Sequence, residues 1–275
     1  MLKRKVETAE SKTAKKRKPS PALQKSKSSK KNVQKKPEVR QKGKKNVKPV
    51  ANTMEEEGKN SSYPKLIDEG TNVESDEKIE FTAGLPTRNS KGQLVFAGVP
   101  EFRPNMTPKE VMQAGSFGGT YFRPIKSGVT KKSYSGVWKE LPKDWLQGLN
   151  IGQQVSSSTY DEKVNTYKVK CGGSLDMWES SGWIHKQDPY GWFQWYCRFY
   201  QGRRTDDDNR QIGRWLRCAG PTGRWRNNLI SKCVKSGCGY NNHSISPVVR
   251  QTLQHWGYKL NQEDFNAYAK KKRLL

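Results

Sequence analysis

The chain has 275 residues, of which 52 are Lys or Arg and 26 are Asp or Glu, so its formal net charge is +26. Only 32% of the residues are hydrophobic, whereas a folded domain is usually about one-half apolar. This composition excludes a chain that folds along its whole length. No apolar run approaches the roughly 20 residues of a membrane-spanning helix, so we expect no membrane partner.

Residues 1–95 are predicted to form a long disordered basic tail. Residues 1–50 contain 16 Lys and 3 Arg against 3 Glu, a net charge of +16, and no aromatic residue. Residues 54–80 are an acidic and polar linker, in which Glu55, Glu56 and Glu57 reverse the local charge. Such segments cannot bury enough apolar surface to offset the entropy of ordering.

Two basic clusters in this tail have the form of a bipartite nuclear-import signal. An import receptor binds extended chain by seating basic side chains over aromatic rings, which requires a flexible and densely charged segment. The sequence therefore predicts a nucleus-localised protein with a nuclear import receptor as partner; the alternative is a tail that only improves solubility. The clusters are Lys3, Arg4 and Lys5, then Lys15, Lys16, Arg17 and Lys18 before Pro19.

The same tail predicts electrostatic binding to DNA or RNA. Each Lys that neutralises a phosphate releases condensed counterions, so such binding weakens steeply with salt. Lys outnumbers Arg by 16 to 3 in residues 1–50, and Lys acts as a point charge rather than as a bidentate reader of bases. We therefore expect non-sequence-specific affinity from the tail. The alternative is that the same charges bind RNA and retain the protein in the nucleolus.

Residues 96–275 are predicted to form a single compact domain that is mainly α, built of short helices with minor strand content. The stretch from Phe96 to Tyr268 contains all nine Trp, seven of the eight Phe and ten of the eleven Tyr, which suits one core. Five cysteines are an odd number and no secretory signal precedes them, so we expect free thiols in a reducing compartment.

Capping residues predict the helices in chain order. Thr107 and Glu110 form a capping box around Pro108, and Gly115 ends this first helix. Period-two alternation predicts a strand at 165–171, and 93–97 is a second candidate. The later helices are predicted after Ser174 up to Gly182, from Pro189 to Gly202, from Asp206 to Leu216, from Gly223 to about Val234, from Ser246 to Gly257 and from Asn261 to about Lys271.

The segment 188–204 is the most aromatic part of the chain. On a helix its aromatic residues cover nearly the whole circumference, which is typical of a buried central helix; the alternative is an exposed platform on which bases stack. The glycine-rich segment 118–124, which follows residues 114–117, is similarly predicted to be a tight turn that docks Tyr121 and Phe122 into the core. Its alternative is an anion-binding loop, although it lacks the spacing of known phosphate loops.

Eight arginines lie within 29 residues after the start of that aromatic segment. Guanidinium groups make bidentate contacts to phosphate, so this density predicts a phosphate-facing, nucleic-acid-binding surface. Structural ion pairs and stacking on aromatic rings within the fold are the alternative. The eight are Arg198, Arg203, Arg204, Arg210, Arg214, Arg217, Arg224 and Arg226.

We predict no metal and no cofactor. Cys233, Cys238 and His243 carry zinc-binding side chains, but their spacing is loose and a fourth ligand, His255 or Cys218, must come from elsewhere. Zinc at these residues remains an alternative to buried or idle thiols. The last two predicted helices similarly form either a helix-turn-helix reader or, as is commoner, an ordinary helical hairpin.

Whether the protein is an enzyme is left open, with a binding protein favoured. The sequence contains no G-x-S-x-G elbow and no papain-like cysteine. Two-metal phosphodiester hydrolysis needs converging carboxylates, for which the candidates are Asp176, Glu179 and the cluster Asp206 to Asp208.

Two unusual motifs also carry a resemblance. With FGGTYFRPI at 117–125 and DPYGWFQWYCRFYQGRR at 188–204, the chain resembles an uncharacterised family of eukaryotic proteins, from about Phe102 to about Ala269. The resemblance implies no activity, ligand or site residue. The sequence as a whole predicts a nuclear nucleic-acid-binding or chromatin-associated protein; the alternatives are a metal-dependent, nuclease-like enzyme and a protein-interaction scaffold.

Overall fold

The structure is a computed structural model, and it describes residues 79–272. Within this range 42% of the residues are helical and 6% are in strands, so the described part is mostly helical with short helices, as predicted. The predicted basic tail up to residue 78 and both basic clusters lie outside the described residues.

The first predicted helix is present as α1 (Pro108–Gln113), and its capping box is complete. The Thr107 hydroxyl accepts a hydrogen bond from the Glu110 backbone N–H at 3.1 Å. The Glu110 carboxylate accepts in turn from the Thr107 N–H at 2.7 Å. Two unsatisfied backbone donors at this helix end are therefore satisfied reciprocally.

The other predicted helices are also confirmed. Side chains of Ser174 and Asn261 cap α2 and α7 by accepting from the backbone N–H three residues later. The helices are α2 (Leu175–Ser180), α3 (Trp192–Tyr200), α4 (Asp208–Cys218), α5 (Arg224–Lys235), α6 (Pro247–His255) and α7 (Gln262–Lys271). Single turns are η1 (Phe117–Gly119), η2 (Val137–Glu140), η3 (Lys143–Trp145), the π-helical η4 (Ile151–Val155) and η5 (Glu162–Val164).

The strands of the described residues form two small antiparallel hairpins. β1 (Thr87–Arg88) pairs with β2 (Leu94–Val95), which lies within the candidate strand 93–97. β3 (Ile125–Lys126) pairs with β4 (Ser133–Tyr134).

The predicted strand at 165–171 is wrong, because this segment is a series of turns. Lys168 has a positive φ of 52°. The Asn165 side chain, fully buried, accepts from the Gly118 N–H at 2.8 Å and donates to the Val169 carbonyl at 2.7 Å. These hydrogen bonds bend the backbone around the Asn165 amide. The alternating positions of Tyr167, Val169 and Cys171 in the sequence therefore do not correspond to the two faces of a β-strand.

Residues before Phe96, where we predicted the folded part to start, also take part in the fold. Leu94 is buried, and the N–H groups of Thr82 and Ala83 both donate to the Gly202 carbonyl at 3.0 Å. The chain from about residue 82 is therefore tied to the segment that follows α3.

The core is centred on α3, which confirms the prediction of a buried central helix. Trp195, Tyr196 and Phe199 are all 0% exposed. Phe102 lies against these three residues and against Trp215 of α4, with ring centroids 5.1 to 5.8 Å apart. The tight turn at η1 also matches its prediction, since Tyr121 and Phe122 are buried in this core.

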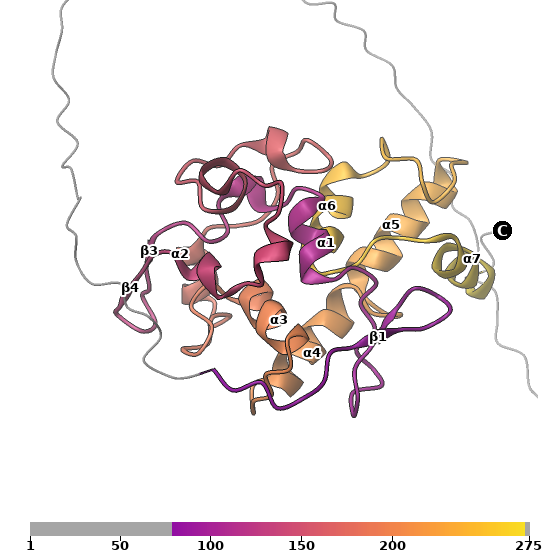
Figure 1. Ribbon diagram of the computed structural model, residues 1–275. Helices are drawn as coiled ribbons and strands as arrows, with labels where there is room; N and C mark the ends of the chain where they lie inside the picture. Colours follow the sequence, from indigo (N-terminus) through magenta and orange to yellow (C-terminus); the bar gives the residue numbers. More distant parts are fainter. Residues whose placement is uncertain (1–78, 273–275) are drawn as a thin grey trace, which may run out of the picture. The chain divides into compact units, whose positions relative to one another are not determined.

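The remaining helices surround α3. In the view of Figure 1, α2 and the β3–β4 hairpin lie to one side of α3, and α5, α6 and α7 lie to the other. α4 packs on α3 and on α5, and α6 and α7 both pack on α5. No helix among residues 79–272 is long and apolar enough to cross a membrane.

Candidate binding pocket

A pocket of about 670 Å³ opens beside α3. Its walls come from segments far apart in the sequence: η1, α2 and the loop that follows it, the start of α3, and the ends of α4, α5 and α6 that lie next to one another. Its volume lies within the range of small-molecule sites, which is about 300–1,000 Å³.

Aromatic side chains dominate the pocket walls. Five of the nine tryptophans contribute, and Trp183 is 45% exposed, which is unusual for so large an apolar side chain. The aromatic lining residues are Phe117, Tyr121, Tyr160, Trp178, Trp183, Tyr190, Trp192, Phe193, Trp225 and Trp256.

The charged residues that line the pocket are all arginines. Arg214 and Arg217 come from the end of α4, Arg224 is the first residue of α5, and Arg123 follows η1. Among the described residues, no Asp or Glu lines this pocket. The pocket therefore combines apolar, stackable walls with an uncompensated positive charge.

A tight connection between α4 and α5 places these arginines together. The loop 219–223 folds back on the helix end, since the Gly220 N–H donates to the Trp215 carbonyl and the Gly223 N–H donates to the Gly220 carbonyl. A Cβ added to Gly223 would lie only 2.5 Å from the Cys218 carbonyl oxygen, so this close approach requires glycine. The short loop keeps Arg224 close to the arginines of α4.

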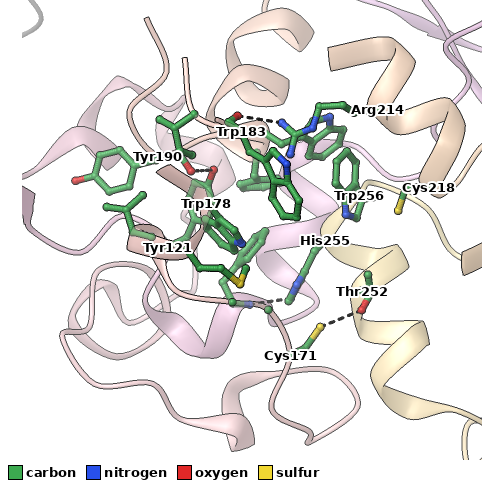
Figure 2. Close-up of a pocket in the computed structure, with 18 of the residues that line it drawn as sticks. Tyr121, Cys171, Trp178, Trp183, Tyr190, Arg214, Cys218, Thr252, His255 and Trp256 are labelled. Carbon is green, nitrogen blue, oxygen red and sulfur yellow. Dashed lines mark hydrogen bonds between the residues drawn. The ribbon is translucent and has the colours of Figure 1, made fainter. Parts of the chain in front are cut away.

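Arg214 lies between two tryptophans of the pocket (Figure 2). Its guanidinium carbon is 5.7 Å from the ring centroid of Trp183 and 5.5 Å from that of Trp256. It donates to the Trp183 carbonyl at 3.3 Å and to the Gln211 side chain at 2.9 Å, and both acceptors are neutral. Burial, followed by the nearby charge of Arg210, lowers the pKa of Arg214 to about 10, so it remains charged at neutral pH.

The η1 turn forms another wall of the pocket. Phe117, Gly118 and Gly119 all have positive φ, and a Cβ at Gly119 would lie 1.9 Å from the Gln153 carbonyl oxygen. This turn stacks the Phe117 ring on the His255 imidazole, with centroids 4.0 Å apart and planes inclined by 17°. It also directs the Phe117 N–H onto His255 Nε2 at 2.9 Å.

His255 is a neutral imidazole with one ring nitrogen already used. Burial lowers its pKa to about 3. Because Nε2 accepts from the Phe117 N–H, the proton of the neutral ring lies on Nδ1. No hydrogen bond to Nδ1 is found among the described residues, although His255 is only 8% exposed and lines the pocket.

Two cysteines line the pocket as thiols. Burial raises the pKa of Cys218 to about 12, against the opposing effect of Arg224 and Arg214. Burial also raises the pKa of Cys171, whose sulfur lies 3.2 Å from the Thr252 hydroxyl. Both side chains are therefore protonated at neutral pH.

The other five predicted arginines have partners within the fold. Asp188, fully buried, accepts two hydrogen bonds from Arg203 and one from Arg198, and Arg198 also pairs with Glu140. The remaining pairs are Arg210 with Asp207, Arg226 with Asp264, and Arg204 over the Phe199 ring. The structure thus brings only Arg214, Arg217 and Arg224 of the eight to the pocket.

The zinc-binding alternative has no convergent ligands. Cys233 accepts a hydrogen bond from Arg250, Cys238 donates to the Ser236 carbonyl, and His243 lies edge-on to Tyr167. Within residues 79–272 no group of three or more His, Cys, Asp or Glu side chains is placed to hold a metal ion.

The carboxylates considered for hydrolysis are also dispersed. Asp207 pairs with Arg210, and Asp208 accepts from the Trp195 indole N–H at 2.8 Å. Glu179 accepts from Ser127 and from the Gly128 N–H, and Asp176 is exposed. None of these acidic residues lines the pocket.

For most residues of the pocket, the sequence gives no indication that they lie at a common site. Trp183 and Trp256 each lie near the end of a short element, and only the fold places them on both sides of Arg214. Three pocket arginines, Arg214, Arg217 and Arg224, could be singled out from the sequence, because they belong to the arginine-dense stretch. Comparison of the chain with protein-family models, with curated proteins and with solved structures finds no match.

Proposed function

We propose that this protein binds nucleic acid in the nucleus, where it contacts phosphate through the arginines of the pocket. Residues 96–275 act in this proposal as a single compact domain, and the basic tail adds sequence-independent affinity. The observation that carries the proposal is the gathering of Arg214, Arg217 and Arg224 at an aromatic pocket that no carboxylate lines among the described residues.

An anionic ligand is favoured because these arginines lie close together and no carboxylate lines the pocket among the described residues. Burial, followed by the charge of Arg210, lowers the pKa of Arg214, and Arg217 lowers it further; Asp207, which opposes them, is paired with Arg210. A phosphate at this position would replace repulsion by charge-assisted hydrogen bonds.

A nucleic acid provides both features that the pocket would recognise. Its phosphates match the arginines, and its bases present flat faces to aromatic side chains. The scaffold alternative has a protein or a modified residue as ligand; a cationic ligand of this kind is disfavoured because the pocket arginines would repel it. The nuclease-like alternative is disfavoured because Asp207, Asp208 and Glu179 are engaged in other contacts, and among the described residues no three carboxylates, histidines or cysteines are grouped to hold a metal ion.

The proposal is tested by the salt dependence of nucleic-acid binding by the full-length protein. Each phosphate contact contributes a slope of about 0.9 to the plot of log affinity against log salt on duplex DNA. The double variant Arg217→Glu/Arg224→Glu should lower that slope by about 2 units and weaken binding uniformly across sequences. Fluorescence anisotropy with labelled oligonucleotides measures both quantities.

A matched control separates these contacts from the overall charge of the protein. Lys139 and Lys143 are exposed and outside the pocket, so Lys139→Glu/Lys143→Glu makes the same change in net charge. We expect this control to retain most of the wild-type affinity and slope. Equal losses in the two double variants would contradict a role for the pocket arginines.

A further inference from the structure

We propose that the pocket receives one unstacked, unpaired base of a nucleic acid, with the adjoining phosphate held by the arginines at the junction of α4 and α5. This inference rests on the proposed function and gives its ligand a specific form. A base within a duplex has both faces covered by its neighbours, so aromatic walls can stack only on a base that has left the helix or belongs to a single strand.

The phosphate end of the pocket is marked by the first turn of α5. This helix of 12 residues begins at the pocket with Arg224 and Trp225, has no side-chain cap and carries no acidic residue in its first turn. Helix N-termini ordinarily attract acidic side chains, because their free N–H groups and dipole favour negative charge. Here arginine replaces them, so helix dipole and guanidinium groups both favour a bound anion.

The base end is marked by tryptophans that lie beside arginines. Trp183 is 45% exposed, and Arg214 lies near its ring and that of Trp256. The Arg224 guanidinium similarly lies 4.9 Å from the Trp225 ring centroid. An indole beside a cation offers a stacking face next to a phosphate contact, which is the arrangement that single-strand binding sites use.

Unpartnered N–H groups in the wall indicate a polar ligand rather than a hydrocarbon. The Trp192 indole N–H is buried and has no hydrogen-bond partner among the described residues, and Trp192 is only 7% exposed. His255 adds the Nδ1–H described above. Donors without partners are rare in folded proteins, and a nucleobase presents carbonyl and ring-nitrogen acceptors of the kind that N–H donors bind.

Figure 2 shows how these groups are arranged. In this view Trp183, Trp256 and Arg214 lie together, His255 lies below them, and Cys171 and Thr252 lie on the side of His255 away from Arg214. Both thiols of the pocket are protonated at neutral pH, and no carboxylate lines it among the described residues. The pocket therefore has the groups to bind a base and its phosphate.

The test compares three short duplexes that bind to the full-length protein at a fixed salt concentration. The first is fully paired, the second carries one central unpaired base, and the third carries an abasic residue at that position. We expect the unpaired base to strengthen binding about ten-fold or more over the other two, since one base–aromatic stack accounts for a change of that order. The tail contributes equally to all three probes.

Two variants and one control assign the preference to the pocket. Trp183→Ala should abolish the preference for the unpaired base, and Trp225→Ala provides a second substitution should the first lower stability. Phe81→Ala removes an aromatic residue that is 49% exposed and lies outside the pocket, so it should keep the preference.

The outcomes separate this inference from the function on which it rests. Equal binding of all three duplexes would overturn the base pocket and leave nucleic-acid binding standing. A preference that survives in both tryptophan variants would overturn it as well. Failure of the wild-type protein to bind any of the probes would contradict the proposed function itself.

Discussion

At the scale of single residues, Asp188 shows how a charged group can hold a fold together. Its carboxylate is 0% exposed and accepts from Arg203 at 2.6 and 2.9 Å and from Arg198 at 3.0 Å. Removing one partner of a buried ion pair leaves an uncompensated charge, which costs about 3–5 kcal/mol. We predict that loss for Asp188→Asn, measured as the free energy of unfolding in urea.

The contrasting substitution is Arg217→Ala, because Arg217 is exposed and has no carboxylate partner among the described residues. It should change the unfolding free energy by no more than about 0.5 kcal/mol. A similar loss in both variants would mean that the Asp188 cluster is not a special determinant of stability.

His255 should make stability depend on pH. Its pKa is about 3 in the fold and ordinarily about 6.5 in an unfolded chain. Between these values the unfolded state binds a proton that the folded state does not. The free energy of unfolding is therefore highest above about pH 6.5 and decreases as the pH falls towards 3. The decline is up to about 1.4 kcal/mol per pH unit.

The variant His255→Gln isolates this contribution, since glutamine does not titrate. Urea unfolding at several pH values between 7.5 and 5 should give a smaller decline for the variant than for the wild-type protein. The remaining titratable groups are shared by both proteins and so cancel. Identical pH profiles would contradict a neutral, buried His255.

At the scale of elements, local chemistry accounts for the starts of three predicted helices, α1, α2 and α7, while α3 to α6 have no side-chain cap. Thr107, Ser174 and Asn261 cap their helices as the sequence indicates, because a side chain and a backbone group only three residues away decide each start. The alternation of side chains at 165–171 did not predict a strand correctly, because a strand also needs a neighbouring strand with which it can pair. There the Asn165 side chain binds the backbone instead and bends it into turns.

The pocket depends on information that no single element contains. The arginine-dense stretch includes the pocket arginines Arg214, Arg217 and Arg224. The same stretch also includes Arg203, which the fold buries against Asp188. Asp207 pairs with Arg210 only three residues away, but Arg198 and Arg226 find their carboxylates, Glu140 and Asp264, through tertiary packing between residues that are distant in sequence. The sequence therefore predicts that arginines form a binding surface, but it does not predict which of the eight arginines line the pocket.

At the scale of the whole molecule, the tail and the folded part should make separable contributions to binding. If about six of the tail lysines engage phosphates, deleting residues 1–50 should lower the salt slope on duplex DNA by about 5 units and weaken binding to all sequences alike. Titration of the truncated and full-length proteins over a salt series measures this change. Unchanged affinity and slope would assign binding to the folded part alone.

Localisation tests the import signal independently of binding. Replacing residues 15–18 by alanine should move a fluorescent fusion from the nucleus to the cytoplasm, because the receptor would lose the denser of the two basic clusters. Live-cell imaging with the unaltered fusion as reference measures the shift. A cytoplasmic signal already present in the reference would contradict the nuclear assignment.

The concentration of tryptophan around one pocket gives the protein a built-in optical reporter. Five of its nine indoles line that cavity, while others such as Trp195 are sealed in the core. Light emitted by the exposed Trp183 responds to whatever replaces water at its ring, and a stacked base quenches indole emission by direct contact. Occupancy of the pocket can therefore be followed in solution without attaching a dye, by selective loss of the emission that Trp183→Ala removes.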